Sequence, residues 1–222
     1  MSEFLDILQR SERWFEFRKA GAPGNPYRCA VGASEVADAI GYNGKAAQVA
    51  LWQSKSGLLK DREANYAMQR GKALEPRIKQ LYEAATKTTG APVVCYRSSV
   101  PFMFASLDWT LPDHSVIAEM KYHDKLSHFM VHAGKVPAKN AIQIQAQLFC
   151  SEAEVCHLAS ISSWGSFAFM PVFPSPDRAP IPWSRMLSEV EKFCIAVTKG
   201  EQPDYSMGIA SDFVNAITRE ET

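Results

Sequence analysis

Phe102-Met-Phe-Ala-Ser-Leu-Asp-Trp-Thr110 is the most informative run of this sequence. After a proline-containing turn it is followed by a second run, Ser115-Val-Ile-Ala-Glu-Met-Lys-Tyr122. Both runs are short and rich in β-branched or aromatic residues, which predicts two antiparallel strands of a meander. Because side chains alternate across a strand, Glu119 and Lys121 are predicted to share one face, with Asp108 on the neighbouring strand. Charged side chains on an otherwise buried strand cost several kcal/mol unless they are paired or bind a metal, so these three require an explanation.

Two explanations fit these charged residues. One is a Glu–Lys pair that protects a sheet edge against aggregation. The other is a metal site, because paired carboxylates bind Mg²⁺, and a lysine beside the metal could orient or deprotonate a water molecule or neutralise charge on a phosphorane. Asp-x10-Glu-x-Lys on consecutive strands fits phosphodiester hydrolysis. On these residues alone both explanations stay open.

Periodicity predicts further elements on both sides of these strands. The helices are expected over residues 2–19, 34–39, 46–56, 61–88 (with a break or kink at Gly71 or Pro76), 138–151 and 183–198, and the other strands over 93–100, 154–162 and 164–173. This order places the chain in the α/β (α+β) class, with a helical N-terminal third and a central mixed sheet flanked by helices. We expect a single domain over residues 1–222.

Composition excludes several classes of protein. The 222 residues are 46% hydrophobic and 22% charged, which is sufficient for a core and rules out a wholly disordered, collagen-like or disulfide-scaffold chain. Lysine plus arginine (24) balance aspartate plus glutamate (24), so any nucleic-acid footprint must be local. The five cysteines show no CxxC spacing and are expected to be unpaired thiols. With no long apolar run and no signal peptide, we expect a soluble, intracellular protein.

Six short motifs add a second kind of evidence through their order. They are Trp14-Phe-Glu-Phe-Arg18, Val31-Gly-Ala-Ser-Glu-Val36, Arg70-Gly-Lys-Ala-Leu-Glu75, Ala105-Ser-Leu-Asp108, Glu119-Met-Lys121 and Gln143-Ile-Gln-Ala-Gln147. Over about residues 14–150 they resemble the arginine motif, the T-A-S-E-V turn and the G-x-x-x-E, S-P-D, E-x-K and Q-V-Q motifs of the lambda-exonuclease-like (YqaJ-type) viral recombinases, a branch of the PD-(D/E)xK nuclease superfamily. Leu107 replaces the proline of the S-P-D motif, which is not a ligand. The resemblance implies a restriction-endonuclease-like core.

The resemblance also implies a site for two Mg²⁺ ions, with Mn²⁺ as an alternative. In it Asp108 bridges both ions, and Glu119 with the backbone carbonyl of Met120 completes the coordination of one. Lys121 and Gln145 hold the nucleophilic water in line with the scissile phosphate.

Glu75 is assigned to the second metal ion by the same resemblance, directly or through water. Its alternative explanation is local, because the dipeptide Glu75-Pro76 could simply mark a helix kink with a solvated acid.

A pocket for the 5′-terminal phosphate of a recessed strand is the third implication. It would be formed by Arg18, Ser34 and Ser106, and Ser34 is also expected to cap the helix that follows it. Arg28 is an alternative to Arg18 for the arginine role, since it lies close to the same helix in sequence. Gln143 is assigned to DNA binding.

The expected function is therefore a Mg²⁺-dependent 5′→3′ exonuclease that digests one strand of linear double-stranded DNA to 5′ mononucleotides. It would leave 3′ single-stranded tails for phage-type recombination by strand annealing, in the cytoplasm of a bacterial host. A homotrimer and a single-strand annealing recombinase partner are implied, and no membrane. The alternatives are a structure-selective or restriction-type endonuclease and a catalytically inactive DNA-end-binding module.

Other conspicuous residues have simpler explanations. His128 and His132 are four residues apart, but no glutamate follows the first as the HExxH metal motif requires, so we expect core or solvated histidines. Four tryptophans are expected to be core or interface anchors rather than base-stacking platforms: Trp52, Trp109, Trp164 and Trp183.

Overall fold

The computed structural model describes residues 1–9, 11–59, 66–177 and 181–204, without the side chains of residues 66–68 and 139. The first part of the helix predicted over 61–88, and the chain beyond residue 204, lie outside the described residues. The strands are β1 (Ser2–Leu5), β2 (Val31–Gly32), β3 (Ala91–Arg97), β4 (Met103–Thr110), β5 (Val116–His123), β6 (Val155–Ser162) and β7 (Phe167–Val172). The helices are α1 (Glu12–Ala20), the 3-10 turn η1 (Ala33–Glu35), α2 (Val36–Ala39), α3 (Lys45–Lys55), α4 (Tyr66–Thr86), α5 (Lys125–His132), α6 (Ala138–Ser151) and α7 (Trp183–Lys199).

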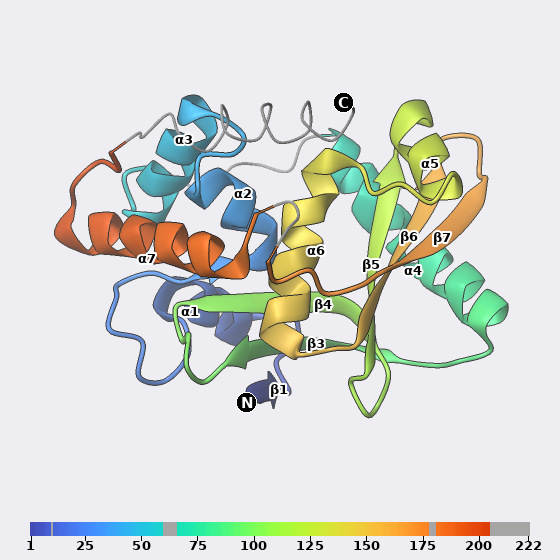
Figure 1. The fold of residues 1–222 in the computed structure, drawn as a ribbon, viewed down its shortest axis with the longest axis horizontal. Coiled ribbons are helices and arrows are strands. Elements are labelled where there is room, and N and C mark those ends of the chain that lie inside the picture. Colours follow the sequence, from blue (N-terminus) through green and yellow to red (C-terminus); the bar gives the residue numbers. More distant parts are fainter. Residues whose placement is uncertain (10, 60–65, 178–180, 205–222) are drawn as a thin grey trace.

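The described strands form one mixed sheet (Figure 1). Its order is β1-β3-β4-β5-β6-β7, with β2 pairing alongside β4. The β5–β6 and β2–β4 pairs are parallel and the other pairs are antiparallel. The predicted class, a mixed sheet flanked by helices, is confirmed.

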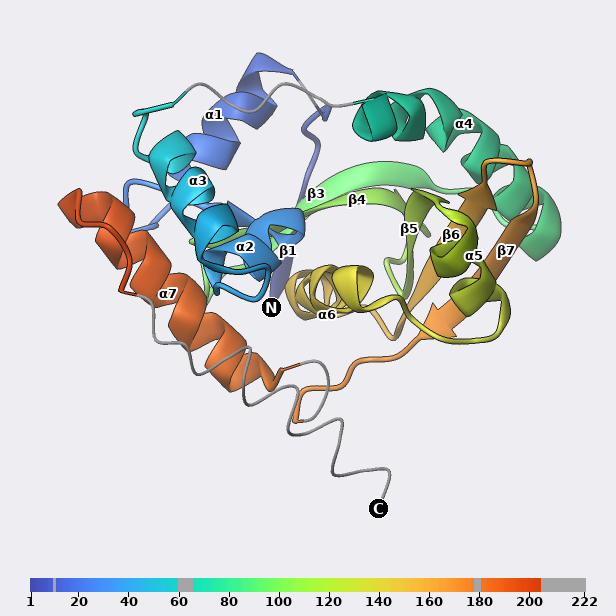
Figure 2. The same cartoon turned by 90° about the horizontal axis from the view of Figure 1, so that it is seen from above.

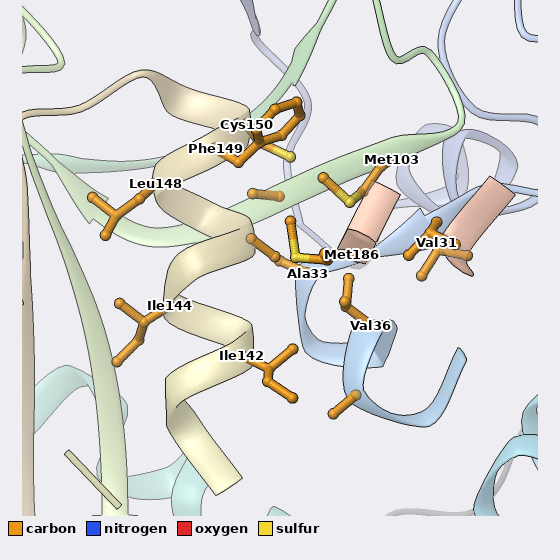
Figure 3. Close-up of a cluster of buried hydrophobic side chains, with 14 of the residues drawn as sticks. Val31, Ala33, Val36, Met103, Ile142, Ile144, Leu148, Phe149, Cys150 and Met186 are labelled. Carbon is orange, nitrogen blue, oxygen red and sulfur yellow. The ribbon is translucent and has the colours of Figure 1, made fainter. Parts of the chain in front are cut away.

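Helices cover both faces of this sheet (Figure 2). On one face lie α6, α2 and α7, and Figure 3 shows aliphatic side chains of α6 meeting residues of β2, η1 and α2 in the larger core. On the other face α4 places Ile78 and Tyr82 against Trp109 and Ala118, while α1 contributes Phe17 to a third cluster. All five cysteines are buried free thiols, as expected. Within the described ranges no helix has the length and apolar character needed to span a membrane.

One predicted helix was wrong, and another is continuous. The helix expected over 2–19 is a strand followed by a helix, because β1 pairs with β3, with Phe4 opposite Cys95, and α1 begins only after the N-cap Ser11. Of the break or kink expected at Gly71 or Pro76, the break is absent, since α4 runs through both residues. Pro76 and the residue four positions before it are exposed, so water can satisfy the carbonyl that loses its helix partner.

Candidate active site

Asp108 lies where β4 departs from regular strand geometry. Val93 pairs with Leu107 and Ala91 pairs with Thr110, so two residues of β4 face the single residue Pro92 of β3. This extra residue is a β-bulge, and a proline opposite it sacrifices no ladder hydrogen bond that the regular sheet would need. The bulge reverses the alternation of side chains in β4 and turns Asp108 towards β5.

The strands β4 and β5 separate at the same point. Their ladder pairs Thr110 with Ile117 and Trp109 with Ala118, and it does not continue to Asp108. Instead the Asp108 carboxylate accepts a hydrogen bond of 2.9 Å from the backbone N–H of Met120. The carboxylate therefore takes over a donor that the ladder leaves unpaired, and this contact fixes its position against β5.

Glu119 is the buried member of the carboxylate cluster, which Asp108, Glu119 and Lys121 form. Its side chain is 2% exposed, and three side chains contact its carboxylate: the Lys121 ammonium, the Gln143 amide at 2.6 Å, and the Gln147 amide. Gln143 and Gln147 are four residues apart on α6, so both project from the same helix face and reach Glu119. Lys121 keeps 29% of its side chain exposed, so the cluster opens to solvent on the lysine side.

The electrostatics of the cluster are dominated by excess negative charge. Burial, followed by the nearby charge of Glu119, raises the pKa of Asp108 well above its usual range, although Lys121 opposes the shift. Glu75, which α4 places half-buried near these groups, adds to the repulsion. For Lys121, burial disfavours the ammonium, but the charges of Glu119 and Asp108 outweigh burial and raise its pKa. Lys121 is therefore a cation and a hydrogen-bond donor.

The cluster suits a hard divalent cation in its donor chemistry. Asp108, Glu119 and Glu75 offer carboxylate oxygens, the ligands that Mg²⁺ and Mn²⁺ take, and one ammonium leaves their combined charge unbalanced. Among the described residues no three His, Cys, Asp or Glu side chains already form a coordination cluster. The fit is therefore one of ligand type and charge.

Gln145 does not lie at this cluster, and its predicted position is wrong. Its amide donates to the carbonyl of Phe173 at 3.0 Å and accepts from the backbone N–H of Ser175 and the indole of Trp183. Successive helix residues are about 100° apart, so Gln145 points away from the face that carries Gln143. Gln147 takes the place beside Glu119, and its spacing of four residues from Gln143 is the signal that would have identified it.

A second charged cluster joins α1, η1 and α3. The Glu35 carboxylate contacts the Arg18 guanidinium, the Lys55 ammonium at 2.8 Å and the backbone N–H of Gly32 at 2.9 Å. Lys55 is 8% exposed, and it also donates to the carbonyl of Ala30 at 2.7 Å. Lys55 is thus a buried support for Glu35, a role that nothing in the local sequence indicates.

Trp14 connects Arg18 to Ser106. The Arg18 guanidinium lies 4.9 Å from the centre of the Trp14 ring, and the indole N–H donates to the Ser106 hydroxyl at 2.8 Å. Because the Ser106 oxygen accepts this bond, its own O–H remains available as a donor. Ser34 is exposed next to Glu35, but the first turn is closed by Glu35 bonding Gly32, so Ser34 is not the predicted cap.

Arg28 lies in a different environment. It is exposed, and its backbone N–H donates to the Thr198 hydroxyl near the end of α7. Of the two arginines considered for phosphate binding, the structure brings only Arg18 together with Ser106.

Replacing Glu35 by glutamine should destabilise the fold in a pH-dependent way. Burial alone would raise the pKa of Glu35, but Lys55 and Arg18 lower it below 4.5. A lowered pKa stabilises the folded state above the unfolded-state value, and this contribution is lost as the pH falls through the folded-state value. We expect Glu35→Gln to lower the free energy of unfolding by about 3 kcal/mol at pH 7 in urea titrations.

The difference in the free energy of unfolding between Glu35→Gln and the parent protein should become smaller as the pH falls below the unfolded-state pKa of Glu35. Adding Lys55→Met to Glu35→Gln should recover part of the lost stability, because the buried ammonium is then removed as well. A difference in the free energy of unfolding that stays constant with pH would contradict the ion-pair explanation.

Comparisons with known proteins identify the family and the fold. Residues 13–154 match the model of the YqaJ-like viral recombinase domain. The fold is similar to an alkaline exonuclease, LHK-Exo, from Laribacter hongkongensis, with a TM-score of 0.68 and 19% identity over 96% of this chain and 100% of that one. The same enzyme in complex with dAMP gives a TM-score of 0.63 and 18% identity over 95% of this chain and 98% of that one.

A phage related exonuclease from Haemophilus somnus is similar at a TM-score of 0.53 and 13% identity, over 87% of this chain and 98% of that one. At these identities the likeness establishes the fold. No curated protein matches the chain. The family model spans more than half of the sequence and includes both charged clusters, so the chain belongs to the YqaJ-like viral recombinase domain family.

Proposed function

We propose that the protein is a Mg²⁺-dependent 5′→3′ exonuclease that digests one strand of linear double-stranded DNA to 5′ mononucleotides and leaves 3′ single-stranded tails for recombination. The observation that carries the proposal is the convergence of Asp108, Glu119 and Lys121 where β4 and β5 separate. The family and the exonuclease descriptions of two proteins of similar fold support the same chemistry.

Each residue of the carboxylate cluster would have its own role in hydrolysis. Asp108, Glu119 and Glu75 would hold the cation, with the Met120 carbonyl as a further ligand. A bound cation would activate water and stabilise the charge that develops on the phosphate. Lys121, a cation at the solvent side of the cluster, would donate to the attacking water or to a phosphate oxygen. Glu119 is kept in one orientation by the two glutamines of α6, so its oxygens need no reorganisation.

The polarity of digestion would come from the cluster around Arg18. Arg18 and Ser106 are held together through Trp14 and offer a guanidinium and a hydroxyl donor to an anion. A strand anchored by its 5′ phosphate there would present its first internucleotide bond to the carboxylates. Exposed Ser34, beside Glu35, is the third donor of this proposed pocket.

Linear duplex DNA labelled at either the 5′ or the 3′ terminus tests the proposal. With Mg²⁺, a 5′ label should be released at once as a mononucleotide, whereas a 3′ label should be lost only after the strand has been digested. Without Mg²⁺ neither label should be released. Nicking of closed circles without attack on linear ends would favour an endonuclease, and binding without cleavage under both conditions would favour an inactive end-binding module.

Replacing Arg18 by alanine should remove the preference for 5′-phosphorylated ends over 5′-hydroxyl ends. The expected loss is about 10- to 100-fold in the ratio of the two digestion rates, because one charge-assisted contact to the phosphate is removed. Arg28→Ala is the matched control and should keep the ratio, since Arg28 lies beside α7. A ratio changed only by Arg28→Ala would move the pocket to Arg28, and a ratio changed by neither would remove the pocket.

The family resemblance extends the proposal to assembly. A homotrimer would let the duplex enter a common channel, and a single-strand annealing recombinase would take up the 3′ tail. Light scattering in solution gives the mass that tests the trimer. Co-purification with an annealing protein from the same operon tests the partner.

A further inference from the structure

A groove lies between α5 and the turn that joins β6 to β7. It encloses about 430 Å³ and is lined by hydrophobic and basic side chains. Three of the hydrophobic side chains are unusually exposed, with Leu126 at 71%, Phe129 at 65% and Trp164 at 56%. We call this surface the α5 groove, and its lining residues are Lys125, Leu126, His128, Phe129, His132, Trp164 and Ser166. Of the two roles expected for Trp164, core or interface anchor, its exposure excludes the core.

The α5 groove opens at the same end of the sheet as the candidate active site. Helix α5 starts two residues after β5, the strand that carries Glu119 and Lys121. The β6–β7 turn follows β6, which runs parallel to β5, so both segments leave the sheet at the same end of the strands (Figure 1). The α5 groove therefore lies beyond the C-terminal end of β5, the strand that carries Glu119 and Lys121.

The charge of the α5 groove suits a polyanion. Lys125 and the exposed His132 line it, and the described residues that line it include no aspartate or glutamate. The acid that precedes the helix, Asp124, accepts hydrogen bonds from the backbone and side chain of Ser127 and so caps α5. Aromatic rings beside cations without acids are typical of surfaces that stack the bases of single-stranded DNA.

His128 supplies a buried acceptor in the wall of the α5 groove. The Ser160 hydroxyl is 2.9 Å from Nδ1 of His123 and 2.8 Å from Nδ1 of His128, and it can donate to only one of them. Asn140 accepts from Nε2 of His123, so a neutral His123 ring receives the Ser160 proton at Nδ1, and Ser160 then accepts from Nδ1 of His128.

This chain of hydrogen bonds leaves Nε2 of His128 with a lone pair and, among the described residues, no partner, although His128 is only 3% exposed. Burial, and to a lesser degree His132, lowers the pKa of His128 and keeps the ring neutral. A buried acceptor without a donor costs free energy, and an N–H of a bound group would satisfy it. Each DNA base carries such an N–H.

We propose that the α5 groove binds unpaired bases of a DNA strand. Phe129 and Trp164 provide stacking surfaces, Lys125 lies beside the phosphates, and Nε2 of His128 accepts from a base N–H. That this strand belongs to the nuclease substrate rests on the proposed function. The groove itself requires only single-stranded DNA.

Fluorescence anisotropy of the full chain in EDTA tests the proposal without any cleavage. The probe is a fluorescein-labelled oligothymidylate of about 20 nucleotides, long enough to span several stacking positions. Phe129→Ala and Trp164→Ala should each raise Kd by about tenfold, the order expected for one base stacked on an aromatic ring. Phe173→Ala is the matched control, because Phe173 is 64% exposed and lies outside the groove, and it should leave Kd unchanged.

Two further measurements separate base stacking from other causes. An abasic oligonucleotide with the same number of phosphates should bind the parent and both groove variants equally. Phe129→Tyr should retain the parent Kd, and circular dichroism checks that each variant is folded. Light scattering gives the mass of every variant.

Several outcomes would overturn the proposal. They are absence of oligothymidylate binding by the parent protein, unchanged Kd in both groove variants, and an equal loss in Phe173→Ala. A fall in mass on Phe129→Ala would show that the groove is an interface between copies of the chain. If the parent protein digests DNA and the groove variants bind oligothymidylate as tightly as the parent, only the proposal for the α5 groove is overturned. If the groove variants lose binding and the parent protein does not digest DNA, only the proposed nuclease function is overturned.

Discussion

Asp108→Asn protein should digest linear duplex DNA at least about a thousandfold more slowly than the parent protein. Asparagine keeps the shape of the side chain and an oxygen that can accept from Met120, but it removes the charge that would bind the cation. A bound metal supplies several kcal/mol of charge stabilisation, and about 4 kcal/mol corresponds to the expected loss. The release of labelled mononucleotides at saturating Mg²⁺ measures the effect.

Asp113→Asn is the matched control for this substitution. Asp113 is exposed in the turn between β4 and β5, where its carboxylate bonds Ser115, and it takes no part in the carboxylate cluster. Its variant should digest DNA at the parent rate. Undiminished digestion by Asp108→Asn would show that the cluster is not the active site.

Stability should change in the opposite direction to activity. In the protein without metal, the carboxylates of Asp108, Glu119 and Glu75 repel one another around a single ammonium. Removing one of these carboxylates therefore reduces the repulsion that destabilises the folded state. Asp108→Asn should therefore unfold in urea at a concentration equal to or above that of the parent protein. A purely structural Asp108 would give the reverse, a loss of stability with digestion retained.

The meander and the residues that converge on it could be predicted because local signals agree with the tertiary structure there. Short alternating runs, turn residues and the E-x-K spacing all place Glu119 and Lys121 on one strand face. The bulge that aims Asp108 at β5 is a property of the pairing between two strands. The sequence of β4 alone does not contain that pairing, so the bulge could not be predicted from it.

Helix faces and chain ends were predicted less well, for related reasons. The Gln143–Gln147 motif identified a helix at the site, but the resemblance did not say which glutamines face the carboxylate, and Gln145 points the other way. At the N-terminus the apolar spacing over a few residues fits a strand as well as a helix, and pairing with β3 decides the outcome. The support that Lys55 gives Glu35 joins residues from two separate helical segments, so no local pattern marks it.

Lys121→Met protein should lose digestion by about 100- to 1,000-fold, the range found when one donor to a developing oxyanion is removed. Among the residues that the structure describes, Lys121 is the one cation in contact with Glu119, so the substitution removes the positive charge from the proposed site of attack. Some stability should be lost as well, roughly 1–2 kcal/mol, because Glu119 keeps only the two amides of α6 as partners. Digestion rates and urea titrations on the same preparations separate the two effects.

Lys121→Arg distinguishes a catalytic lysine from a structural one. Arginine restores a positive charge beside Glu119 and should recover the stability, but its planar guanidinium cannot place a compact ammonium at the same point, so most of the rate loss should remain. If Lys121→Met digests DNA in proportion to its folded fraction, the lysine only stabilises Glu119. If instead stability returns with arginine while the rate stays low, the ammonium acts on the phosphate or on the attacking water, because holding Glu119 in place has been achieved without restoring the reaction.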